Sequence, residues 1–170
     1  MEYLIALRLI HIVSSVIWTG GMIYFALFVI PAAKSFGSDG FKFIQQLTIT
    51  NKLPITMNAA AVLSIVTGII LMKELLGGLS LEMVRSPHGV IIVAGSLLAL
   101  ISFAIGLSVN FPAARRMNAI GKMLSISDLP SNPEHLHELQ KLRRRSFAAT
   151  NVIALLLFAS LILMSVVKYF

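Results

Sequence analysis

The sequence predicts an all-α integral membrane protein, a bundle of four transmembrane helices with a helical extension before the fourth span. Of its 170 residues, 57% are hydrophobic and 12% are charged, whereas soluble domains average about 25% charged residues. Four apolar stretches each approach the length of about 20 residues that crosses a bilayer, and no segment shows a strand pattern. These observations exclude a soluble enzyme, a disordered chain and a free nucleic-acid-binding protein.

The four apolar stretches define the expected organisation. We predict spans at about residues 4–32, 53–72, 89–111 and 148–167, all within a single transmembrane domain, 1–170. The first is interrupted only by Arg8 and His11, and Pro87 stands just before the third, where a missing N–H costs little. The connection before the fourth span should be partly helical, because Asn132 is a favourable N-cap and Pro133 fits the first helical position. We find no internal repeat.

Basic residues are concentrated in two of the three connections. Ten of the fourteen Lys and Arg residues lie in residues 33–52 and 112–147. Basic connections of membrane proteins stay in the cytoplasm, so we expect both termini outside, in a prokaryotic cytoplasmic membrane. The three arginines at 143–145 should lie at the headgroups as a topology anchor that attracts anionic lipid, and a specific lipid or regulatory site is the alternative.

His11 is the main candidate for chemistry. It lies about seven residues inside the first span, roughly 10 Å deep at about 1.5 Å per residue, and ionisable groups at such depth are usually functional. Arg8, His11, Ser15 and Trp18 recur at steps of three and four residues, so they share one face of the helix. His11 is either a structural histidine bonded to a neighbouring helix or a ligand of a metal or haem iron.

The predicted cofactor-binding residues are His11, His88, Arg8, Ser15 and Trp18, and the predicted metal ligands are the two histidines. His88 opens the third span on the same outer side as His11, and neutral imidazole commonly binds haem iron and copper. Arg8, one turn above His11, either pairs with a haem propionate through a bidentate hydrogen bond or snorkels to the headgroups. Ser15, one turn deeper, lies near enough to orient the ring of His11.

No catalytic residue is predicted. All seven acidic residues lie outside the spans, and the sequence contains no nucleotide-binding loop or serine nucleophile motif. The chain has no cysteine, which excludes disulfides, iron–sulfur clusters and covalent attachment of haem. Any enzymatic activity would be that of an oxidoreductase.

The first span resembles a known group of small membrane proteins. His11, Trp18 and Gly20 form a His-x6-Trp-x-Gly pattern similar to that of the CopD-like copper-resistance family and the HemJ-like protoporphyrinogen oxidases. The end of the third span, residues 109–116, looks like that of uncharacterised four-helix members. The resemblance implies that His11 binds haem or a metal. HemJ-like enzymes carry a Lys in a later helix that is tied to their activity, and the third span here has none, which disfavours porphyrinogen oxidation.

Three functions follow from these residues, and we favour the first. It is a b-type haem protein with its haem near the outer leaflet, acting in electron transfer or in haem or redox sensing with a redox partner. The second is a copper-binding or copper-transport protein that uses the same histidine with nearby methionines. The third is a cofactor-free scaffold or partner subunit. Besides the lipid bilayer, a second copy of the chain is an expected partner, since a homodimer would share ligands across its interface.

The charge distribution generates a topology test. Because the native chain has no cysteine, Ser35→Cys and Ser127→Cys each introduce a unique thiol. In intact cells both thiols should be shielded from a membrane-impermeant reagent, whereas Glu2→Cys, beside the N-terminus, should react. Labelling of both serine positions without permeabilisation would reverse the assignment.

Overall fold

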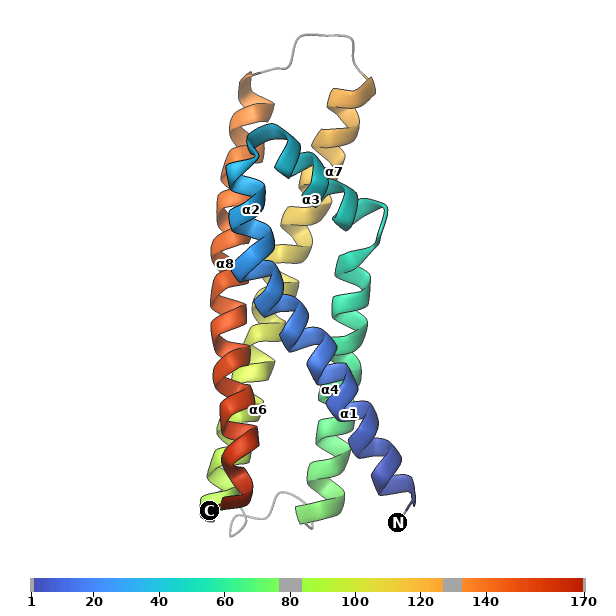
Figure 1. Ribbon diagram of the computed structural model, residues 1–170, viewed down its shortest axis with the longest axis vertical. Helices are drawn as coiled ribbons and strands as arrows, with labels where there is room; N and C mark the ends of the chain where they lie inside the picture. The colour runs from blue at the N-terminus through green and yellow to red at the C-terminus, as the bar shows by residue number, and fades with distance from the viewer. Residues whose placement is uncertain (1, 77–83, 127–132, 170) are drawn as a thin grey trace.

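The protein is an all-α membrane bundle, as the sequence predicts. The computed structural model describes residues 2–76, 84–126 and 133–169, and these form helices and no strand. Four helices are long and apolar enough to cross a membrane: Glu2–Ser35, Leu53–Glu74, Pro87–Gly121 and Pro133–Val166. Both termini lie at one end of the bundle, here called the terminal end, and the opposite end is called the basic end (Figure 1).

The chain crosses the bundle four times. The first crossing comprises α1 (Glu2–Tyr24), the π-helical turn η1 (Phe25–Val29) and α2 (Ile30–Ser35). At the basic end α3 (Gly37–Ile49) lies across the bundle, and α4 (Leu53–Leu76) returns to the terminal end (Figure 1). The third crossing comprises α6 (Pro87–Ile105), the π-helical turn η2 (Gly106–Asn110) and α7 (Phe111–Ile126). The last comprises α8 (Pro133–Val166) and the short η3 (Val167–Tyr169).

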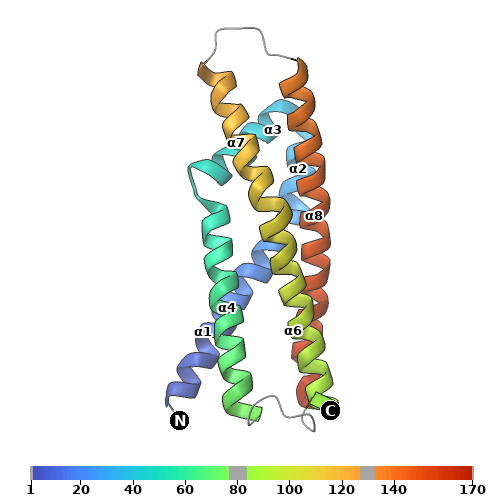
Figure 2. The ribbon, with the colours of Figure 1, turned by 180° about the vertical axis from the view of Figure 1, so that it is seen from behind.

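The helices pack as two pairs. α1 packs along α4 and α6 along α8; α1 also contacts α8, whereas α4 and α6 make little contact. α1 and α6 therefore lie diagonally opposite each other, with α1 running obliquely from α4 towards α8 (Figure 1; Figure 2). The core where the pairs meet is centred on Trp18, Ala61, Ile153 and Leu157.

A proline stands just after each π-helical turn. The N–H of Ile30 bonds to the carbonyl of Phe25, and the N–H of Phe111 bonds to that of Gly106, each five residues back. The next residue is Pro31 in the first case and Pro112 in the second. Proline lacks an N–H and its ring collides with the carbonyl four residues earlier, so the widened turn accommodates it. Both prolines continue as Pro-Ala-Ala followed by a basic residue, a local correspondence between the first and third crossings that the sequence analysis missed.

The helices extend beyond the predicted spans at the basic end. α7 continues to Ile126, through a region predicted to be a connection, and α3 occupies much of the predicted connection 33–52. α3 is amphipathic, with Phe41 and Ile44 turned inward and Lys42 and Phe43 exposed. The helix that starts at Pro133 confirms the extension before the fourth span, whereas Asn132, its expected N-cap, and Ser127 lie outside the described residues.

Two glycines set the angle between α2 and α3. Gly37 has φ +58°, in the left-handed region, where glycine is favoured because other residues are strained there. Gly40 is buried against α2, and a Cβ at this position would overlap the backbone of Ala33. Gly20, in contrast, has open space where its Cβ would be. Close packing of α3 on α2 therefore depends on Gly40.

This difference predicts opposite behaviour of two identical substitutions. Gly40→Ala should lower the free energy of unfolding by about 1–3 kcal/mol, the usual cost of overpacking. Gly20→Ala should leave it unchanged or raise it slightly, because alanine favours a helix over glycine. Thermal unfolding of the two variants in detergent, followed by circular dichroism, tests this. Equal unfolding temperatures would contradict the close contact between α2 and α3.

Candidate cofactor site around His11

His11 lies on the face of α1 that packs against α4. Its Nδ1 atom is 2.8 Å from the main-chain oxygen of Ser64 and 3.3 Å from Oγ1 of Thr67. A carbonyl oxygen only accepts hydrogen bonds, so Nδ1 carries the proton and donates it to Ser64. The hydroxyl of Thr67 donates to the carbonyl of Leu63 at 2.6 Å, which leaves its lone pairs towards the imidazole. The ring is thereby tied to α4 through one nitrogen.

Ser64 joins α1 to α4 through two separate groups. Its carbonyl accepts from His11, and its hydroxyl lies 2.7 Å from the hydroxyl of Ser15 on α1. Ser64 is buried, and apolar surroundings offer no water to replace these bonds. The pair of contacts fixes both the rotation of α1 against α4 and the orientation of the imidazole.

A stripe of small residues on α4 makes room for this arrangement. Ala60, Ser64 and Gly68 follow one another at four-residue intervals, so they lie on one face of the helix. A Cβ at Gly68 would lie 2.9 Å from Cε1 of His11 and 3.3 Å from Nδ1. The imidazole therefore lies directly over the glycine. Further along the same interface, Gly21 of α1 is close to Met57, whose sulfur would be 2.8 Å from an added Cβ.

The second ring nitrogen of His11 makes no hydrogen bond to the described residues. Nε2 is not fully buried, because it is absent from the buried side-chain atoms of the described residues that lack a partner. The side chain of His11 as a whole is partly exposed. A histidine that donates from Nδ1 to a carbonyl and presents Nε2 with its lone pair is in the tautomer that metal-ligating histidines commonly use. The geometry thus supplies one oriented nitrogen donor inside the membrane.

The other predicted residues on the face of His11 have different environments. Arg8 is exposed one turn nearer the terminal end, and no ion pair joins it to the described carboxylates. The hydroxyl of Ser15 is bonded to Ser64 and makes no hydrogen bond to the imidazole; the carbonyl of Ser64 holds the ring instead. Trp18 is 6% exposed and packs edge-on against Phe103 of α6, with ring centroids 6.3 Å apart. Trp18 is therefore a core residue in this structure.

His88 is not brought to His11. It is exposed in the first turn of α6, whose start is capped by Ser86 accepting from the N–H of Gly89 at 3.0 Å. The ring of His11 is tied to α4, whereas His88 is exposed at the start of α6, a helix that packs mainly on α8. Within the described residues, no group of three or more His, Cys, Asp or Glu side chains converges.

Sequence reasoning missed the residues of α4 that hold His11. Ser64, Thr67 and Gly68 are polar or small residues in an apolar span, and the four-residue spacing of Ala60, Ser64 and Gly68 is typical of close helix contacts in membranes. That spacing is the signal from which the partner helix could have been chosen. The main-chain acceptor could not have been found, because every residue has a carbonyl.

The tautomer of His11 is directly measurable. In protein labelled with ¹⁵N-histidine and solubilised in detergent, the neutral ring of His11 should be protonated at Nδ1, because that nitrogen donates to Ser64. His11→Gln assigns the signals by removing them. Thr67→Val is the matched control: it removes the longer contact and leaves the carbonyl bond, so the tautomer should persist. A neutral ring protonated mainly at Nε2 would contradict the geometry.

Comparison of the chain with protein-family models, with curated proteins and with solved structures finds no match in any of the three. The resemblance of the first span to CopD-like and HemJ-like proteins accordingly stays a prediction. The function proposed below rests on the geometry around His11.

Proposed function

We propose that this membrane protein binds a b-type haem through Nε2 of His11 and serves in electron transfer or redox sensing. The observation that carries the proposal is the imidazole held by Ser64 through Nδ1, with Nε2 left without a hydrogen-bond partner among the described residues. A porphyrin supplies four equatorial nitrogens to its iron, so a single oriented histidine is sufficient protein ligation. A copper site built from protein donors needs several side chains together, and His11 is a single donor.

The surroundings of His11 also fit a haem. Arg8, exposed and without a carboxylate partner among the described residues, lies one turn nearer the terminal end. In that position its planar guanidinium suits a propionate, which accepts two parallel hydrogen bonds. The bound group would supply one-electron chemistry, and the chain supplies its ligand and its orientation.

We further propose that the terminal end faces outward from a prokaryotic cytoplasmic membrane. Supporting this, the two basic connections lie together at the other end of the bundle (Figure 2), where the positive-inside rule places the cytoplasm. His11 and Arg8 then lie in the outer half of the bilayer. A homodimer that shares ligands across its interface is part of the same proposal.

Substitution of His11 tests the proposed ligand. Purified His11→Ala protein should lose most of the Soret absorbance per polypeptide while keeping its helical content, because one imidazole contributes little to the packing of four spans. His137→Ala, an exposed histidine on α8, is the matched control and should keep the wild-type spectrum. His88→Ala should also keep it, since His88 is exposed at the start of α6, which packs mainly on α8.

The same samples distinguish the alternatives. A Soret band of unchanged intensity and position in His11→Ala would refute the proposal. Copper found by elemental analysis, without haem, would favour the metal-binding alternative. Wild-type protein with neither haem nor copper, after expression with an ample haem supply, would favour the cofactor-free scaffold.

A further inference from the structure

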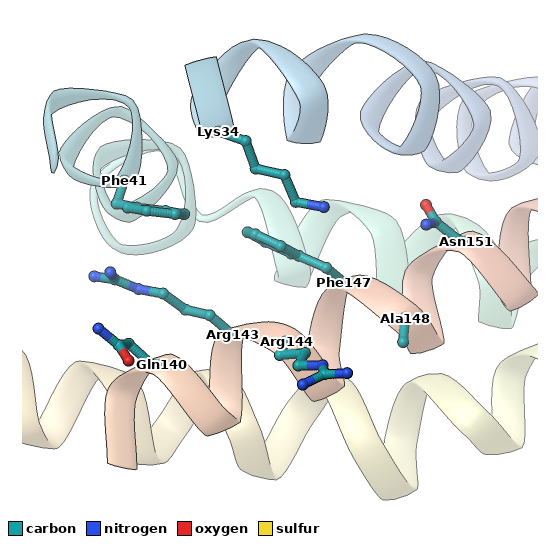
Figure 3. A pocket seen from close by; sticks show the side chains of 8 residues that line it. All are labelled: Lys34, Phe41, Gln140, Arg143, Arg144, Phe147, Ala148 and Asn151. Atoms are coloured by element: carbon teal, nitrogen blue, oxygen red, sulfur yellow. The ribbon is translucent and has the colours of Figure 1, made fainter. Parts of the chain in front are cut away.

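A basic pocket lies at the other end of the molecule, remote from His11. It is a cavity of about 410 Å³ where α2, α3 and α8 meet, and its walls include Lys34, Phe41, Arg143 and Phe147. Lys34 extends from α2 towards Phe147 and Asn151, and Arg143 extends from α8 beside Phe41 and Gln140 (Figure 3). Three separate elements thus contribute side chains to one cationic pocket.

Two aromatic rings hold the cations of this pocket in place. Phe41 of α3 and Phe147 of α8 stack with ring centroids 6.2 Å apart and an interplanar angle of 19°. The guanidinium carbon of Arg143 is 4.2 Å from the centroid of Phe41, and Nζ of Lys34 is 5.7 Å from that of Phe147. Stacking on an aromatic ring uses the flat face of a guanidinium. The N–H donors of Arg143 lie in the plane of the group and stay available to a ligand.

The pocket has positive charge without an acidic partner. In the described part of the chain the ion pairs are Lys42 with Asp39 and Arg116 with Glu138. Neither pair includes Lys34 or Arg143, and Arg144, which also lines the cavity, is exposed. Like charges brought together by α2 and α8 repel one another unless an anion neutralises them. The arrangement therefore favours an anionic ligand.

The position of the pocket indicates the source of that anion. Lys34 directly follows the apolar part of the first crossing, and Arg143 to Arg145 directly precede the apolar part of α8. Ala148 and Asn151, one and two turns further along α8, line the same cavity. A ligand here would have its charge at headgroup depth and its apolar part beside the bundle. Basic pockets between transmembrane helices bind lipid headgroups in this way.

We propose that the pocket binds the phosphate of an anionic membrane phospholipid. Arg143 supplies two parallel N–H donors to the phosphate oxygens, as guanidinium does with phosphate groups. Lys34 adds a second charge from α2. The bound lipid would then contact α2, α3 and α8 together at the basic end. This specific binding differs from the general attraction that any run of arginines exerts on an anionic membrane surface.

Native mass spectrometry of the detergent-solubilised full chain tests the proposal. The probes are dioleoylphosphatidylglycerol, dioleoylphosphatidylcholine and inorganic phosphate, each titrated separately. Wild-type protein should retain one phosphatidylglycerol preferentially over phosphatidylcholine, and bind inorganic phosphate much more weakly. Arg143→Gln should weaken phosphatidylglycerol binding by about tenfold or more, since it removes a charged donor from the phosphate.

Arg145→Gln is the matched control. It removes the same charge two residues further on, from an exposed side chain that does not line the cavity, and it should leave phosphatidylglycerol binding unchanged. Arg143→Lys keeps the charge and removes the planar donor pair, so it should give an intermediate loss and remain informative if Arg143→Gln folds poorly.

Three outcomes would overturn the proposal. Equal weakening by the substitutions at Arg143 and Arg145 would mean that net charge alone attracts the lipid. Unchanged binding in Arg143→Gln would separate the lipid from this pocket. Inorganic phosphate bound as tightly as phosphatidylglycerol would identify a site for a free anion in place of a lipid.

Discussion

Polar side chains in the apolar part of this bundle have to find hydrogen-bond partners within the protein, because lipid provides none. Some bond to their own helix: Ser14 donates to the carbonyl of Ile10, and Ser102 to that of Leu98. Others bond across helices and decide how the bundle is put together. Burial of apolar surface cannot make that choice, since lipid tails are as apolar as the facing helices.

The bonds between helices belong to the two helix pairs. Ser15 and His11 bond to Ser64 between α1 and α4. Between α6 and α8, Ser160 donates to the carbonyl of Gly95 at 2.8 Å. Nearer the basic end, Asn110 of η2 donates to Thr150 and accepts from Ser146, which satisfies both ends of its amide group. Each pair is therefore specified by its own polar contacts, and the core around Trp18 joins the pairs by packing.

The same constraint gives His11 its chemical character. A histidine in water could donate from either nitrogen, but a ring beside the carbonyl of Ser64 is protonated at Nδ1. Nε2 is then the ring nitrogen left without a hydrogen-bond partner among the described residues, so the helix contact that stabilises the bundle also prepares a ligand. At the basic end, aromatic rings orient the side chains that would bind a ligand. Phe41 orients Arg143 and Phe147 orients Lys34, and these contacts leave the N–H donors of both cations unused. The two ends of the bundle thus have separate chemistry, one histidine donor and one cationic pocket.

Much of the fold follows from the sequence alone. Apolar stretches of bilayer length determined the four spans, and Pro133 with Glu134 marked the start of the last helix. The amphipathic helix α3 was missed because apolar length dominated the prediction of elements, although Phe41 and Ile44 are spaced as on a helix face. The two π-helical turns could not be predicted from the length of the apolar stretches either. They depend on the positions of Pro31 and Pro112 within otherwise continuous helices.

For the site, the sequence by itself determined that an imidazole lies inside the first span, and on which face of that helix. Tertiary structure decided its partner, because the rotation of α4 that brings the carbonyl of Ser64 to Nδ1 depends on packing at Gly68 and on the Ser15–Ser64 contact. It also placed His11 against α4 and left His88 exposed at the start of α6, which packs mainly on α8. Helical periodicity describes one helix at a time, whereas the pairing of helices depends on contacts between residues far apart in the chain, such as His11 and Ser64, which are 53 positions apart.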